Sequence, residues 1–211
     1  MEIKLAAGDI AKIETDAIIV NYFEKMERLE GDTATVDKAL DGAISQLISQ
    51  GEIKGKLNQI TVIHSLGKLP AARVVVVGLG KQQELSLDKV RGAMAATCRL
   101  LRQKGVKSMA TIAQGAGAAG ITMESAAQAI TEGALLGVYS FRRHQTKEAE
   151  HGEIERLTVV DVDESKILGL ERGCHKGRIL AEATNLARDM VNEPANYMTP
   201  NHMAEMAAKL A

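Results

Sequence analysis

Aromatic residues are scarce in this chain of 211 residues, which contains two Phe, three Tyr and no Trp. Its core must therefore be built from aliphatic side chains, Met and Ala, and a surface that stacks nucleobases is disfavoured. An excess of charge is also absent, because the formal net charge is −1 and Lys and Arg are spread along the chain. We expect no nucleic-acid partner and no anionic membrane surface as a partner.

Cysteines and long apolar runs are scarce as well. Cys98 and Cys174 lie far apart on segments of helical periodicity, which is typical of free thiols in a reducing compartment. No run approaches the eighteen or so apolar residues of a membrane span, and the N-terminus lacks the pattern of a signal peptide. These absences predict a cytoplasmic protein that does not enter a membrane.

Metal-binding and catalytic motifs are absent from the sequence. The five His form no His-Glu-x-x-His pattern, and the two Cys form no Cys-x-x-Cys pair. No Ser-His or Cys-His constellation stands out, and Cys98 on an apolar helix face is expected to be a buried, inert thiol. The sequence therefore predicts no catalytic residue, no cofactor-binding residue and no metal ligand within this chain.

Short β-branched runs alternate with longer segments of helical periodicity. Strands are expected at residues 3–6, 17–20, 60–63, 74–77, 109–113 and 157–160. Helices are expected at residues 35–50, 87–104, 123–140 and 165–192, with Ser86 and Thr122 as caps of the second and third. The 66–72 connection is too short for a helical crossover and favours an antiparallel pair. The pattern predicts an α/β fold, a mixed β-sheet flanked by helices and followed by a long linker helix, with an exposed loop at residues 142–155.

The segment Gly115 to Gly120 reads Gly-Ala-Gly-Ala-Ala-Gly and stands between a predicted strand and a predicted helix. A dinucleotide site needs an acidic strand end about twenty residues later, and the next candidate, Asp161, is about twice as far away. A loop of small residues that turns the chain is the better interpretation. Capture of an anion by backbone N–H groups at the helix start stays open as a third.

The long predicted helix near the C-terminus ends at Glu193-Pro194, because the residue before a proline is pushed out of the helical region. Its length of about 40 Å exceeds what a small sheet covers, so part of it is expected to reach another body. Thr199 and Pro200 then open a new helical pattern. We expect an α/β domain at 1–165, a linker helix at 166–198 and the start of a further, truncated domain at 199–211.

The run from Asn185 to Pro200, which includes Arg188-Asp-Met-Val-Asn-Glu-Pro-Ala-Asn196, resembles the segment that joins the two domains of leucyl (cytosol) aminopeptidases, peptidase family M17. The upstream order of elements is similar, including residues 74–80 and 133–137. The resemblance implies the non-catalytic N-terminal domain of a cytosolic metallo-aminopeptidase, which releases N-terminal amino acids from peptides. It also implies a homo-hexamer in the full-length protein.

The same resemblance implies two divalent metal ions, Zn or Mn, held by the family's C-terminal domain. That domain carries a lysine-and-carboxylate ligand set and a catalytic arginine in an Asn-Thr-Asp-Ala-Glu-Gly-Arg-like motif, and neither occurs in this chain. Two-metal hydrolysis also needs clustered carboxylates, which the chain does not offer. This chain alone is therefore predicted to be inactive, with its own C-terminal catalytic domain as its partner.

A second resemblance supplies an alternative. Gly8-Asp9-Ile10, followed by residues 15–21, is similar to the opening of macro domains, which bind ADP-ribose, and residues 115–120 fall where those domains keep a glycine loop for phosphates. The tract that begins at Asn21 reads Asn-Tyr-Phe-Glu and departs from the Asn-Ala-Ala-Asn of macro domains. The alternative is a free-standing macro-like module that binds ADP-ribose or a related nucleotide, with Asp9 and Gly117 as the residues to test.

Overall fold

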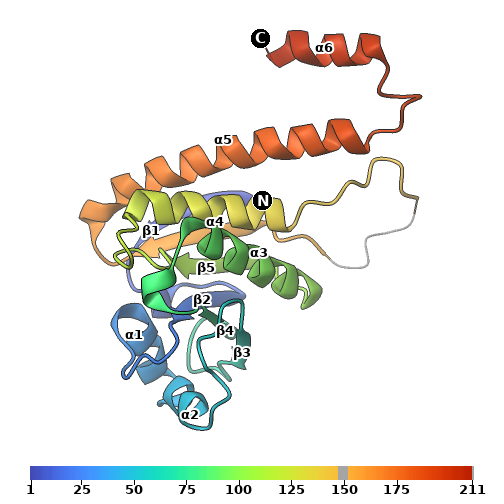
Figure 1. The fold of residues 1–211 in the computed structure, drawn as a ribbon. Coiled ribbons are helices and arrows are strands. Elements are labelled where there is room, and N and C mark those ends of the chain that lie inside the picture. The colour runs from blue at the N-terminus through green and yellow to red at the C-terminus, as the bar shows by residue number, and fades with distance from the viewer. Residues whose placement is uncertain (147–151, 211) are drawn as a thin grey trace.

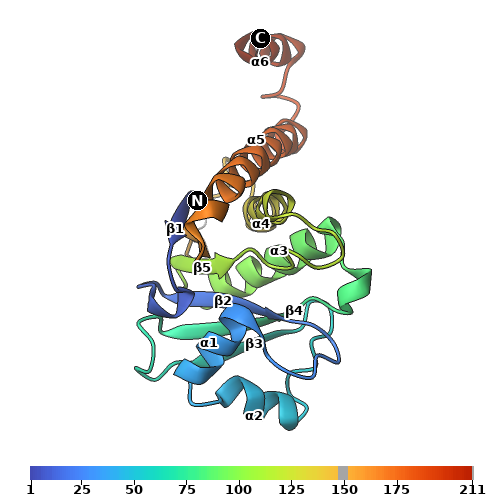
Figure 2. The ribbon, with the colours of Figure 1, turned by 90° about the vertical axis from the view of Figure 1, so that its left-hand side faces the viewer.

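A six-stranded sheet forms the centre of the fold, and helices cover both of its faces (Figure 1, Figure 2). The computed structural model describes residues 1–146 and 152–210. The strands are β1 (Glu2–Ala7), β2 (Ala17–Tyr22), β3 (Ile60–His64), β4 (Arg73–Gly78), β5 (Ser108–Ile112) and β6 (Arg156–Asp161). They lie in the order β1-β6-β5-β2-β4-β3, and β3 with β4 is the antiparallel pair among parallel neighbours. The predictions of an α/β fold, a mixed sheet and this antiparallel pair are confirmed.

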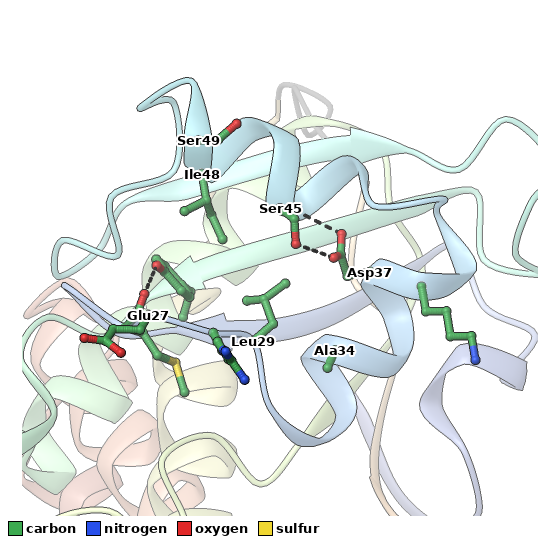
Figure 3. A pocket seen from close by; sticks show the side chains of 11 residues that line it. Glu27, Leu29, Ala34, Asp37, Ser45, Ile48 and Ser49 are labelled. Atoms are coloured by element: carbon green, nitrogen blue, oxygen red, sulfur yellow. Dashed lines mark hydrogen bonds between the residues drawn. The ribbon is translucent and has the colours of Figure 1, made fainter.

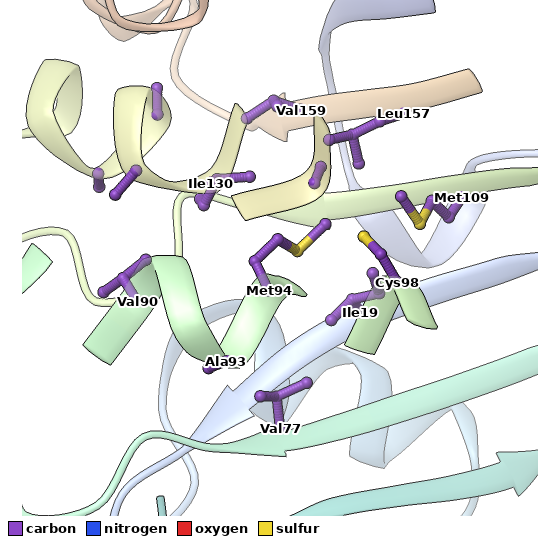
Figure 4. Close-up of a cluster of buried hydrophobic side chains, with 14 of the residues drawn as sticks. Ile19, Val77, Val90, Ala93, Met94, Cys98, Met109, Ile130, Leu157 and Val159 are labelled. Carbon is purple, nitrogen blue, oxygen red and sulfur yellow. The ribbon is translucent and has the colours of Figure 1, made fainter. Parts of the chain in front are cut away.

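Helices lie on both faces of this sheet, and the last described helix stands apart from it (Figure 1, Figure 2). They are α1 (Gly31–Ala39), α2 (Ala43–Ser49), α3 (Leu87–Gln103), α4 (Met123–Gly137), α5 (Ile167–Asn192) and α6 (Pro200–Leu210), with short 3-10 turns η1 (Ile10–Lys12), η2 (Gln82–Glu84) and η3 (Glu164–Lys166). Side chains of α3 and α4 pack on one sheet face around Ile19, Met109 and Leu157 (Figure 4). Side chains of η1, α1 and α2 pack on the other face around Ile18 and Val76.

Both faces of the central strands are buried, as parallel strands require. Ile18 and Ile19 are adjacent, and both are completely buried, because successive side chains of a strand point to opposite faces. The core is almost entirely aliphatic side chains, Met and Ala. Cys98 and Cys174 are free and buried in the first cluster, and burial raises the pKa of Cys98 to about 12. The expectations of an aliphatic core and of free thiols, with Cys98 buried, are confirmed.

The single helix predicted between residues 35 and 50 is wrong. The chain breaks at Asp41 and Gly42, which have φ of 55° and 83°, so α1 and α2 are separate helices. The Asp37 carboxylate of α1 accepts hydrogen bonds from the N–H groups of Ile44 (2.8 Å) and Ser45 (3.1 Å) and from the Ser45 hydroxyl (2.5 Å). Figure 3 shows this contact on the wall of a cavity of about 490 Å³. Asp37 thus satisfies the open N–H groups of the first turn of α2.

Three predicted helix starts are confirmed by their caps, whereas α5 begins at Ile167, two residues after the predicted start, without a side-chain cap. Ser86 Oγ accepts from the N–H of Lys89, and Thr122 Oγ1 accepts from the N–H of Ser125. Thr199 Oγ1 accepts from the N–H of His202 over 3.3 Å, and α6 begins at Pro200. Residues 147–151 of the predicted loop and the last residue of the predicted 199–211 segment lie outside the described residues.

The long helix α5 has 26 residues, and its burial changes along its length. Its buried residues, which all lie in its first part, are Leu170, Gly173, Cys174, Gly177 and Ala181. The second part extends along α4 toward α6, which stands apart from the sheet (Figure 1, Figure 2). Part of this helix thus extends beyond the sheet, and its contact with another body stays a prediction. Within the described residues, no helix combines the length and the apolar character that crossing a membrane demands.

Candidate functional site

The order of strands and helices places one crevice at the carboxyl ends of β2 and β5, which are neighbours in the sheet. The chain leaves β2 for α1 on one face of the sheet and leaves β5 for α4 on the other face. Such a divergence opens a crevice between the two strand ends, where α/β proteins bind ligands. A cleft of about 340 Å³ lies there and is lined by the ends of β2, β5 and β6 and the starts of α1 and α4. We take this cleft as the candidate functional site.

Carboxylates dominate the polar wall of the cleft. Asp32 at the start of α1 and Asp161 at the end of β6 both line it, together with Glu30. Burial raises the pKa of Asp32, and the negative charges of Asp161 and Asp9 raise it further. Lys166 is the cationic side chain in the described lining, and its Nζ lies 3.6 Å from Asp161 Oδ1. The cleft therefore presents net negative charge to any ligand.

Apolar side chains also line the cleft. They are Phe23, Met26, Leu29, Ile112 and Met123. Thr33 Oγ1 donates to the carbonyl oxygen of Asn21 over 3.0 Å, which ties the start of α1 to the end of β2. The cleft thus suits a ligand with an apolar part and a group that tolerates or complements carboxylates.

The glycine-rich loop uses much of its own hydrogen-bonding capacity. The N–H groups of Ala116, Gly117, Ala118 and Ile121 donate to the carbonyls of Ala113, Ile121, Gly115 and Ala118 over 2.9–3.1 Å. The helix start that follows is capped by Thr122. Those donors are not available to a phosphate, which weakens the anion interpretation. The left-handed φ values of Gly115 (76°), Gly117 (83°) and Gly120 (75°) support the interpretation as a turn of small residues.

The residues that the macro-like alternative singled out are only partly brought together. Asn21 and Gly115 line the cleft, whereas Asp9 and Gly117 do not. Asp9 Oδ1 instead accepts from the N–H of Ala11 over 2.9 Å and caps η1. Gly117 is held by the loop bond described above.

Sequence reasoning missed the acidic pair of the cleft. Asp161 is too distant in sequence from the glycine loop for a dinucleotide fingerprint, yet its strand lies beside β5, and Asp161 and the loop share one edge of the sheet. Its position at the end of a predicted strand was the available signal, because parallel strands bring their carboxyl ends to the same edge. Nothing in the sequence around Asp32 signals its place in the cleft. Across residues 1–146 and 152–210, no group of three or more His, Cys, Asp and Glu could hold a metal ion.

Comparisons with known proteins place the chain in a family. The family model for the N-terminal domain of the cytosol aminopeptidase family matches residues 19–148. A curated cytosol aminopeptidase sequence from Alkaliphilus oremlandii is 35% identical over 212 residues, which are 100% of this chain and 42% of the relative. The chain thus spans less than half the length of this relative.

Solved structures agree on the fold. The tomato leucine aminopeptidase mutant K354E superposes with a TM-score of 0.80 at 22% identity, over 100% of this chain and 42% of that one. A Trypanosoma brucei macrodomain, solved in complex with ADP, superposes with a TM-score of 0.60 at 16% identity, over 81% of this chain and 68% of that one. The expected macro-like architecture is confirmed at the level of the fold. The chain belongs to the cytosol aminopeptidase family, peptidase family M17, and carries its N-terminal domain.

Proposed function

We propose that this chain serves as the non-catalytic N-terminal domain of a metallo-aminopeptidase that releases N-terminal amino acids from peptides. The observation that carries the proposal is coverage: the whole chain aligns with 42% of a cytosol aminopeptidase, so the relative has a further part that this chain does not match. In this proposal that further part is the catalytic domain. It holds two divalent ions, Zn or Mn, and the full-length protein works in the cytoplasm as a homo-hexamer.

The outer face of α5 supports a partner domain near the C-terminal end of the chain. Val191 is 84% exposed and Ile179 is 53% exposed, although both are large apolar residues. A groove of about 500 Å³ follows this helix and is lined by Ile179, Glu182, Ala183, Leu186, Ala187, Met190 and Leu210. Apolar surface of this extent is typical of a face that another domain covers. We propose that the catalytic domain covers it, with domain boundaries near residues 165 and 198.

The test compares this chain with the product of its complete native reading frame. Both are purified, incubated with Mn²⁺ or Zn²⁺ and assayed for hydrolysis of leucine amide, and their bound metal is measured by mass spectrometry. We expect hydrolysis and stoichiometric metal in the complete product and neither in residues 1–211, because two-metal hydrolysis requires a carboxylate cluster. Hydrolysis or stoichiometric metal in the 211-residue chain would overturn the proposal.

Binding of ADP-ribose or a related nucleotide at the cleft is the second candidate function, favoured by the position of the cleft at the divergence of β2 and β5. The carboxylates of Asp32 and Asp161 oppose a pyrophosphate, and four N–H groups of the glycine loop are already used. We therefore expect calorimetry with ADP-ribose at millimolar concentration to give no saturable heat. Saturable heat that disappears in Ala116→Trp, whose ring would fill the cleft, would establish the second function instead.

A further inference from the structure

The run that carries the family resemblance faces the segment that follows α4. Residues 185–197 form the end of α5 and the turn after it, and residues 135–144 form the last turn of α4 and the start of the next loop. Many contacts between the two stretches are side-chain hydrogen bonds. The first part of α5 differs, because it packs closely on α4 through small residues such as Gly173 and Gly177.

Two side chains of α5 bind the open end of α4. Arg188 Nη1 donates to the carbonyl of Leu136 over 3.2 Å, and Asn185 Nδ2 donates to the carbonyl of Leu135 over 3.4 Å. Carbonyls in the last turn of a helix lack intrahelical donors, and a guanidinium also complements the negative end of the helix dipole. Arg188 further lies over the ring of Tyr139, with its Cζ 5.3 Å from the ring centroid. These contacts fix α5 lengthwise against the end of α4.

Tyr139 links the same segment to the next turn of α5. Its hydroxyl donates to Asp189 Oδ1 over 2.8 Å and accepts from Asn192 Nδ2 over 3.2 Å. A single hydroxyl thus joins two residues, one near the end of α5 and one at its end. Both hydrogen bonds can form only when the end of α5 is rotated about its axis so that Asp189 and Asn192 face Tyr139.

Glu193 is the residue at which the chain leaves α5. Its side chain is only 6% exposed, and its carboxylate pairs with Arg143 (Nη1 to Oε2, 3.1 Å) and with the His144 ring. The hydrogen bond from His144 and then that from Arg143 lower the pKa of Glu193. The His144 ring stacks on Tyr197, with centroids 4.6 Å apart and an interplanar angle of 24°. Glu193 and the turn after it are therefore held from the same loop.

We propose that residues 135–144 and 185–197 form a clasp that fixes the direction in which the chain leaves α5. Glu193, Tyr139 and His144 are positioning residues: they act through the orientation of whatever follows Pro194. The backbone geometry agrees, because Glu193 ends the helix in an extended conformation (φ −68°, ψ 127°) and sets the exit path. The consequence for a catalytic domain rests on the proposed function, whereas the clasp itself is a property of this chain.

Hydrogen exchange on the 211-residue chain tests the clasp. The N–H groups of Tyr197 and Met198 both donate to the carbonyl of Pro194, over 2.8 and 2.9 Å, and report the turn after α5. In Glu193→Gln we expect these two amides to exchange about tenfold faster, because charge-assisted hydrogen bonds are lost. The amides of β2 should keep their native rates. Glu182→Gln is the matched control, the same change on an exposed position of the same helix, and should have no effect.

A second variant changes a residue of the clasp that follows α4 rather than one at the end of α5. Tyr139→Phe removes one hydroxyl and keeps the ring, so it should speed exchange in the same turn while the sheet stays protected. Native rates at Tyr197 and Met198 in both variants, or an equal rise in Glu182→Gln, would overturn the proposal. The readout needs no peptidase activity, so failure of the clasp and failure of the proposed function are distinguishable.

Acid should open the clasp in the native chain. The folded pKa of Glu193 lies below its ordinary value of 4.5, so its stabilisation is present above that value and is lost as the pH falls through the lowered pKa. The charged and titratable groups facing it are Arg143 and His144 from the loop and Asp189 from α5. After correction for intrinsic rates, exchange of Tyr197 and Met198 should rise below pH 4.5 in the native chain. Glu193→Gln should lack this step, and an identical acid step in that variant would contradict the assignment to Glu193.

Discussion

Gly173→Ala is expected to lower the free energy of unfolding by about 2–3 kcal/mol, because one methyl group would separate two helices. A Cβ at Gly173 would lie 2.1 Å from the carbonyl oxygen of Glu124 and 2.8 Å from Ala127 Cβ, both on α4. The nearest obstacle is backbone, so α5 itself must move. The loss exceeds the gain of about 1 kcal/mol that Ala brings to a helix interior. For a chain of this size the midpoint of thermal unfolding should fall by about 4–12 °C.

Gly169→Ala provides the control on the same helix. The nearest atom to a Cβ at Gly169 is Met123 Cβ at 3.9 Å, which is ordinary contact. A small stabilisation should then appear, below the value of about 1 kcal/mol for a helix interior, because Gly169 lies in the first turn of α5. Thermal unfolding followed by circular dichroism measures both variants. Equal midpoints for Gly169→Ala and Gly173→Ala would show that the helix crossing is looser than the structure has it.

Arg91→Leu is the second substitution with a large expected effect. Arg91 of α3 lies with its Nε 2.5 Å from Oε2 of Glu132 on α4, and Gln128 Nε2 donates to the other oxygen over 2.7 Å. The Glu132 side chain is 7% exposed, so removal of the guanidinium leaves a buried carboxylate without its cation. We expect a loss of about 2–4 kcal/mol in the free energy of unfolding, measured by urea denaturation. The lower end of this range allows for the partial exposure of Arg91.

A double variant separates the charge effect from the packing effect. Arg91→Leu with Glu132→Leu removes both charges, so most of the lost stability should return, leaving a deficit below about 1 kcal/mol. Asp88 also forms an ion pair with Arg91, but the Asp88 side chain is 91% exposed. Asp88→Asn is therefore the control. It should change stability by less than about 0.5 kcal/mol. A double variant as unstable as Arg91→Leu would mean that Arg91 acts through its aliphatic stem rather than through its charge.

The sequence predicted the elements that depend on local patterns. The strands around Ile18 and Val75 follow from β-branched residues, and the helix starts at Leu87, Met123 and Pro200 follow from their caps. The break between α1 and α2 was hidden because Val36, Leu40 and Ile44 face the same side of the sheet, so their periodicity continues across it. The carboxylate that caps α2 comes from seven residues before Ile44, which lies beyond the spacing of a local cap signal.

The cleft could not be assembled from the sequence for a different reason. Asp32 and Asp161 line the same cleft because β2, β5 and β6 lie side by side in the sheet. No local sequence pattern predicts this strand order. The glycine loop shows the converse. Its letters fit a phosphate cradle, but the bonds of Ala116 and Gly117 within the loop depend on the three-dimensional path of the backbone. Residue spacing therefore predicts where the chain turns, and topology decides what the turn can bind.

The scarcity of aromatic residues gives the clasp its own optical probe. The chain has three Tyr and no Trp, and two of the three, Tyr139 and Tyr197, lie in the clasp. The third, Tyr22, is buried and donates its hydroxyl to the carbonyl of Met26 over 2.8 Å. Two of the three tyrosines that can emit in the unlabelled chain therefore lie at the exit from α5. Movement of this junction can be followed by tyrosine fluorescence in solution without introducing a dye or a reporter residue.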